Sequence, residues 1–115
     1  MKIGHIELFV EDATASKDFY ESVLGFEVVA VQSPDQIWVG CGEMEILLRK
    51  GNPTNSNRYE TSNNGIVLYT DDLESASQAL ANRGLTFKGT VDTNKCMAFT
   101  DLDGHWFQLV NPNDL

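Results

Sequence analysis

The stretch that decides the fold is GHIELFVED at residues 4–12, because it returns as NGIVLYTDD at residues 64–72. Apolar residues hold matching places in the two segments, as Leu8 and Leu68 do, and an acidic pair closes each one. Both segments alternate in the manner of a half-buried β-strand. A repeat of this length predicts two similar modules in one chain.

A helix is expected directly after each of these strands. Asp12 and Asp72 are suitable N-caps, since their carboxylates can accept the free amide hydrogens of a first helical turn. Glycines at Gly25 and Gly84 suit the left-handed position that follows a helix. Each module therefore begins with a strand and a helix.

Three short strands are expected to follow each helix. They fall near Phe26–Gln32, Gln36–Cys41, Glu43–Arg49, Thr86–Val91, Lys95–Thr100 and Trp106–Val110.

This order predicts an α+β fold of two tandem βαβββ modules in a single domain over residues 1–115. Module 1 covers about 1–50, a polar linker about 51–62, and module 2 about 63–115. One helix covers only one face of each sheet. Two modules side by side would leave a concave mixed-sheet trough, which is the kind of surface that binds small ligands.

Charge narrows the classes of partner. The 115 residues carry a formal net charge of −9, which argues against nucleic acid and against an anionic membrane surface. The acidic balance either keeps the protein soluble or favours a cationic ligand. No apolar run is long enough to span a membrane. With two cysteines and no signal-peptide pattern, we expect a cytoplasmic protein whose Cys41 and Cys96 are reduced and line the core or a pocket.

Three stretches resemble a known family. Residues 5–12 (HIELFVED) and 19–26 (FYESVLGF) resemble the N-terminal signature of the vicinal oxygen chelate superfamily. Residues 99–110 (FTDLDGHWFQLV) resemble its C-terminal signature. That superfamily includes glyoxalase I, extradiol dioxygenases, fosfomycin-resistance enzymes and bleomycin-binding proteins. The resemblance covers nearly the whole chain and implies the fold, but the fold alone does not assign an activity.

The resemblance also implies where a metal would be held in metal-dependent relatives. Carried onto this chain, the ligand positions fall on His5, Glu45, Gly65 and Gln108. A divalent metal prefers three or four His or carboxylate ligands. Glycine provides none, and glutamine is a weak neutral one. We therefore predict no metal and no cofactor, and we interpret His5 as a hydrogen-bonding residue of a pocket.

Strand alternation selects the residues that would face the trough. The aromatic members would stack on a planar ligand or, alternatively, pack between modules or seal a dimer interface. Arg58 and Tyr59 in the linker form a candidate lid, while His105 after the Asp-Gly turn is expected to be exposed. The predicted ligand-binding residues are His5, Glu7, Phe9, Trp38, Glu45, Tyr69, Trp106 and Gln108.

Two functions follow from different classes. The first, which we favour, is a homodimeric binding protein like the metal-free bleomycin-resistance branch. It would sequester a cationic or neutral aromatic compound such as an antibiotic, without metal-dependent chemistry. The alternative is a metal-dependent glyoxalase- or dioxygenase-type lyase or oxidoreductase. A third reading is a metal-free isomerase or lyase with Glu45 or Glu7 as the base.

Overall fold

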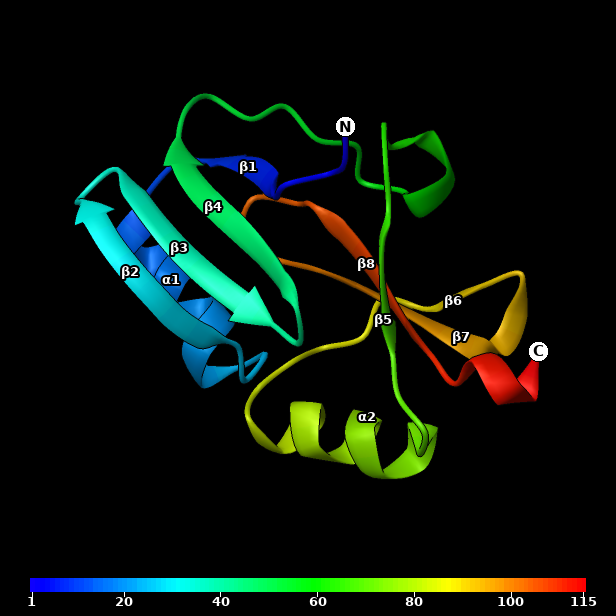
Figure 1. The fold of residues 1–115 in the computed structure, drawn as a ribbon. Helices are drawn as coiled ribbons and strands as arrows, with labels where there is room; N and C mark the ends of the chain where they lie inside the picture. The colour runs from blue at the N-terminus through cyan, green and yellow to red at the C-terminus, as the bar shows by residue number, and fades with distance from the viewer. The chain divides into compact units, whose positions relative to one another are not determined.

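A computed structural model describes all 115 residues, which divide into two compact units, Met1–Thr54 and Asn55–Leu115. The first unit runs through β1 (Ile6–Val10), α1 (Ala13–Ser22), β2 (Glu27–Ser33), β3 (Gln36–Cys41) and β4 (Met44–Lys50). Its strands form one sheet in the order β1-β4-β3-β2, and α1 lies against one face of it (Figure 1). Strand β1 pairs with β4 in parallel, and the other pairs are antiparallel.

The second unit repeats this order. It holds β5 (Ile66–Tyr69), α2 (Leu73–Asn82), β6 (Thr90–Val91), β7 (Thr93–Thr100) and β8 (Trp106–Val110), with sheet order β5-β8-β7-β6. Short 3-10 turns, η1 (Tyr59–Thr61) and η2 (Pro112–Asp114), precede and follow these elements. Strand β5 is again parallel to β8. The predicted α+β fold of two βαβββ modules is confirmed.

Both helices start and stop where the sequence indicates. One oxygen of Asp12 accepts the amides of Thr14 and Ala15 at 3.1 Å each. Asp72 likewise accepts the amide of Ser75 at 3.0 Å. Gly25 and Gly84 have φ values of 77° and 106°, so each helix ends at a backbone conformation that disfavours a side chain.

Strand β6 is the element that the sequence places least well. It covers Thr90–Val91 rather than the expected Thr86–Val91. Gly89 has a φ of 96°, which interrupts the extended backbone directly before it. Lys88 and Gly89 still exchange backbone hydrogen bonds with Ala98, so the segment follows β7 without forming a regular ladder.

Each unit has its own core between helix and sheet. In the first, Leu8, Val10, Tyr20, Ile46 and Leu48 are among the buried residues. In the second, the buried residues include Leu80, Phe99, Phe107 and Leu109. Phe99 and Phe107 stack with ring centroids 5.1 Å apart. Because these side chains alternate along their strands, the intervening residues lie on the sheet face opposite the helix.

The two cysteines differ in environment. Cys96 is buried, as expected. Cys41 is exposed, and its placement in the core was wrong. It ends β3 beside the turn at Gly42, whose φ is 60°, where the strand leaves the core. Neighbouring atoms still desolvate the sulfur and raise the pKa of the Cys41 thiol, so it stays protonated at neutral pH.

The ends of the first and last strands are joined in the same manner in both units. Lys50 Nζ donates to the carbonyl of Glu11 at 2.9 Å, and Asn111 Nδ2 donates to the carbonyl of Asp71 at 3.2 Å. These four residues hold equivalent places in the repeat. Neither helix has the length and hydropathy that crossing a membrane requires.

Candidate functional site

The face of the first sheet opposite α1 carries five of the eight predicted site residues. We call it the helix-free face of the first unit. Register aligns its rows, with Glu7 beside Leu47 and Leu47 beside Trp38. Phe9 is 50% exposed there, and Glu45 is also exposed. His5 lies one residue before β1.

Glu7 is the centre of a polar network on this face. Arg49 Nε donates to one of its oxygens at 2.7 Å, and His5 Nε2 lies 3.3 Å from the other. Hydrogen bonding from Arg49, and then from His5, lowers the pKa of Glu7 below its ordinary value. Glu7 is therefore an ionised carboxylate whose charge Arg49 largely matches, and it is a weak proton acceptor at neutral pH.

Trp38 is held in place beside this network. Its indole Nε1 donates to Gln32 Oε1 at 3.0 Å. The His5 ring contacts it edge-on, with centroids 4.6 Å apart and an interplanar angle of 63°. Trp38 is half-buried. An aromatic surface with a fixed orientation is available for a planar ligand at low entropic cost.

The corresponding face of the second sheet, opposite α2, carries the other three predicted residues. We call it the helix-free face of the second unit. Gln108 lies between Val67 and Ala98. Tyr69 is 74% exposed, whereas Trp106 is only 5% exposed. Tyr69 is thus accessible, and something covers Trp106.

The cover is a segment within the range that the sequence predicts as linker. We call residues Asn55–Ser62 the strap, and it belongs to the second unit. Three long-range hydrogen bonds join it to β8 and the preceding turn. Asn55 Nδ2 donates to the carbonyl of Asp103 at 2.8 Å, Trp106 Nε1 to the carbonyl of Ser56 at 2.9 Å, and Gln108 Nε2 to Tyr59 Oη at 2.8 Å.

Tyr59 occupies the space that a side chain at position 65 would need. A Cβ built on Gly65 would lie 2.3 Å from Tyr59 Oη and 2.8 Å from its Cζ. The Tyr59 ring also packs edge-on against Trp106 at 5.9 Å. Sequence reasoning named Tyr59 as part of a lid but left it out of the site residues. The available signal was that Tyr59 is the only aromatic residue in the polar stretch 51–62.

His105 is buried, and the expectation that it is exposed was wrong. Its Nδ1 lies 2.7 Å from Asp101 Oδ2, while Asp101 Oδ1 accepts the amides of Asp103 and His105. Asp101, Asp103 and His105 are close enough together to hold an ion. Their hydrogen bonds nevertheless account for both oxygens of Asp101, so the group stabilises the turn before β8.

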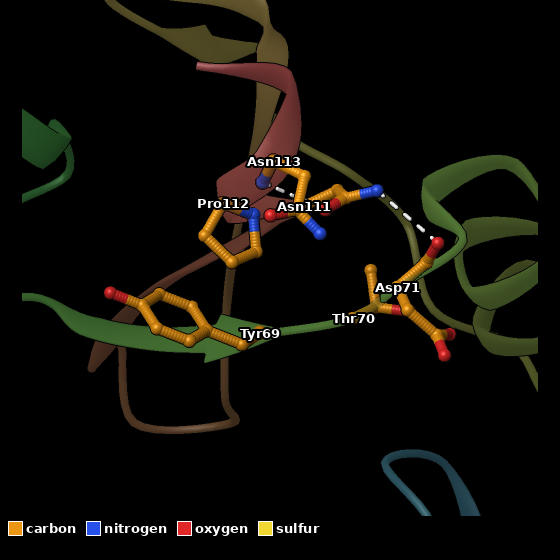
Figure 2. Close-up of a pocket in the computed structure, with 6 residues that line it drawn as sticks. All are labelled: Tyr69, Thr70, Asp71, Asn111, Pro112 and Asn113. Atoms are coloured by element: carbon orange, nitrogen blue, oxygen red, sulfur yellow. Dashed lines mark hydrogen bonds between the residues drawn. The ribbon is translucent and has the colours of Figure 1, made fainter.

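Two surface depressions lie at strand ends. Figure 2 shows the one at the ends of β5 and β8, about 490 Å³ in volume and lined by Tyr69, Asp71, Asn111 and Pro112 among others. The other, about 530 Å³, is bordered by Arg49 and the turn between β2 and β3. Both are open, and neither is lined by His5, Glu7 or Trp38, so the side-chain contacts define the candidate site.

A family model for the glyoxalase/bleomycin resistance protein/dioxygenase superfamily matches residues 2–109. The chain belongs to this superfamily. Among curated proteins, none is similar enough in sequence to count as a relative.

Several solved structures share the fold. A protein from the mobile metagenome of V. pseudocholerae is 28% identical, with a TM-score of 0.68 and 95% of each chain covered. Fosfomycin resistance protein FosX from Mesorhizobium loti is 19% identical, with a TM-score of 0.72, covering 95% of this chain and 90% of FosX. Lactoylglutathione lyase from Agrobacterium tumefaciens is 16% identical, with a TM-score of 0.73 and coverage of 96% and 93%.

Strand register corrects one of the positions that the superfamily resemblance implies for a metal. Ile6 pairs with Ile46 in the first unit, and its counterpart Ile66 pairs with Phe107 in the second. One residue further on, the counterpart of Gln108 is therefore Leu47. Glu45 corresponds to Trp106 instead.

The positions implied for a metal thus hold His5, Leu47, Gly65 and Gln108. Leucine and glycine offer no donor atom, and the Gln108 amide already donates to Tyr59. These residues do not fit a divalent metal, which needs several His or carboxylate ligands.

Proposed function

We propose that the protein binds and sequesters a cationic or neutral aromatic small molecule, such as an antibiotic, without metal-dependent chemistry. The observation that carries this proposal is the residue set at the four superfamily positions, of which only His5 is an ordinary metal ligand. Two findings support a role in antibiotic resistance. The chain belongs to the glyoxalase/bleomycin resistance protein/dioxygenase superfamily, and a fosfomycin resistance protein is among its structural neighbours.

The first unit supplies the recognition chemistry in this proposal. Trp38 is held by Gln32 and His5 and presents a flat aromatic surface. Glu7 is already paired with Arg49, which leaves Glu45 and Glu27 as exposed carboxylates on the same face. Glu45, together with the net charge of −9, favours positive charge on the ligand.

The network argues against Glu7 as the base of a metal-free isomerase or lyase. A carboxylate whose pKa is lowered by Arg49 and His5 accepts protons poorly at neutral pH. A metal-dependent lyase or oxidoreductase would instead require a stoichiometric ion. Metal analysis of the dialysed protein separates the two functions, and we expect far less than one zinc, nickel or iron per chain.

Ligand titration monitored by Trp fluorescence tests the binding function. We expect a panel of cationic aromatic compounds, including glycopeptide-type and quinone drugs, to bind more tightly than anionic compounds of similar size. Their affinity should fall as salt rises. Glu45→Gln should weaken cationic binding about threefold, the size expected of an exposed charge pair.

The matched control is Glu21→Gln, which makes the same charge change at an exposed position on α1. It should leave cationic binding unchanged. Equal losses in both variants would mean that only the overall charge matters. Tighter binding of the anionic compounds would overturn the electrostatic part of the proposal.

A further inference from the structure

We propose that the helix-free face of the second unit is a binding site for a hydroxylated aromatic ring, and that the Tyr59 side chain occupies this site when no ligand is bound. This rests on the proposed function in that the chain binds small molecules, and it names a ligand class for the second unit. Tyr59 shows which chemistry the face accepts, because its ring and hydroxyl make contacts that a free phenol would also make.

Three features define the site. The Trp106 ring meets the occupant edge-on, with centroids 5.9 Å apart and an angle of 79°. The Gln108 amide donates to the hydroxyl at 2.8 Å. Gly65 leaves open the space that the hydroxyl fills. Trp106 would accept any aromatic edge, whereas Gln108 favours a ring with a hydroxyl, since its part-buried amide needs an acceptor.

The strap is held weakly enough for the Tyr59 side chain to leave the site. Most of its residues are exposed, and Tyr59 is its only aromatic side chain. Apart from Tyr59, its long-range hydrogen bonds involve one carbonyl and one asparagine amide. A segment with so little buried apolar surface opens at low free-energy cost. A free phenol therefore competes with Tyr59, and its apparent affinity is reduced by the fraction of time that the strap is closed.

The test uses p-cresol as the probe, because it is the side chain of tyrosine without the backbone, and toluene as its hydroxyl-free match. Tyr59→Ala removes the occupant from the full chain. We expect this variant to bind p-cresol at least tenfold more tightly than the unchanged protein, measured by calorimetry and Trp fluorescence. It should also prefer p-cresol to toluene, and adding Gln108→Leu should abolish that preference.

A permanent plug is the competing role for Tyr59, and it predicts a different result. If Tyr59→Ala binds p-cresol no better than the unchanged protein, or binds toluene equally well, the proposal is wrong. If that variant does not fold, amide hydrogen exchange of the unchanged protein decides. Exchange over residues 55–62 should rise at saturating p-cresol, and constant exchange there despite binding would overturn the proposal.

The two proposals fail separately. Glu45→Gln reports on cationic ligands at the first unit, and Gln108→Leu reports on the hydroxyl preference at the second. If Tyr59→Ala does not bind p-cresol but the cationic compounds still bind the first unit, only the inference about Tyr59 is rejected.

Discussion

Asp101 is a buried acidic residue that depends on its hydrogen-bond partners. Its side chain is fully buried, and it depends on two backbone amides and the His105 ring to offset the loss of water. The residue orders the turn before β8, and β8 carries Trp106 and Gln108. The geometry of the second unit's helix-free face thus depends on a buried hydrogen-bond contact between Asp101 and His105, which lies outside that face.

Removing His105 should destabilise the second unit strongly. His105→Ala leaves the Asp101 carboxylate buried with one fewer partner, and we expect a loss of about 3 kcal/mol in the free energy of unfolding. Urea denaturation measures it. Glu60→Ala breaks the exposed ion pair with Arg58 in the same unit and should change the free energy of unfolding far less. Equal effects of the two variants would contradict this account.

The burial of His105 could not be predicted from the sequence. Nothing in a linear pattern distinguishes a histidine exposed after an Asp-Gly turn from one folded back onto a carboxylate four residues earlier. The capping role of Asp12 and Asp72 could be predicted in full, because it depends only on amides two or three residues away.

At the scale of elements, capping residues determine where the helices begin. Strand pairing determines which side chains lie on each face of a sheet. Ile46, Leu47 and Leu48 are consecutive and all buried, so β4 is covered on both faces there. Alternation identifies a face only when one side is solvated. For this reason the sequence placed one implied metal-ligand position on Glu45, whereas the strand register makes Leu47 the counterpart of Gln108.

The two helix caps give a direct test at this scale. Asp12→Ala should lower the free energy of unfolding by about 1 kcal/mol or slightly more, because two amides lose their acceptor. Asp72→Ala should cost less, since one amide does. Asparagine at either position keeps the acceptor and should restore most of the stability. Thermal denaturation monitored by circular dichroism compares all four variants, and an asparagine as damaging as alanine would rule out the cap.

At the scale of the whole molecule, exposed apolar residues bear on assembly. Phe9, Val67 and Tyr69 are 50%, 44% and 74% exposed, and all three lie on edge strands. Exposed apolar side chains along sheet edges favour association, and two-fold dimers are the commonest assembly of soluble proteins. We propose that the chain forms a homodimer.

Sedimentation equilibrium tests the dimer. We expect a particle of twice the 12.8 kDa chain mass at high micromolar concentration. A mass of one chain across the whole concentration series would refute the proposal. Added salt should strengthen association, because each chain carries a net charge of −9 and salt screens the repulsion between two copies.

Gly65 and Tyr59 also constrain which substitutions the helix-free face of the second unit can accept. A histidine introduced at position 65 meets the Tyr59 ring, and loss of Tyr59 alone uncovers Trp106 without adding a metal ligand. A metal ligand at position 65 therefore needs both substitutions, and their effects on metal binding should be strongly non-additive. Loss of Tyr59 alone should favour a free phenol instead. The contact between one glycine and one tyrosine thus links metal binding and phenol binding on the same face.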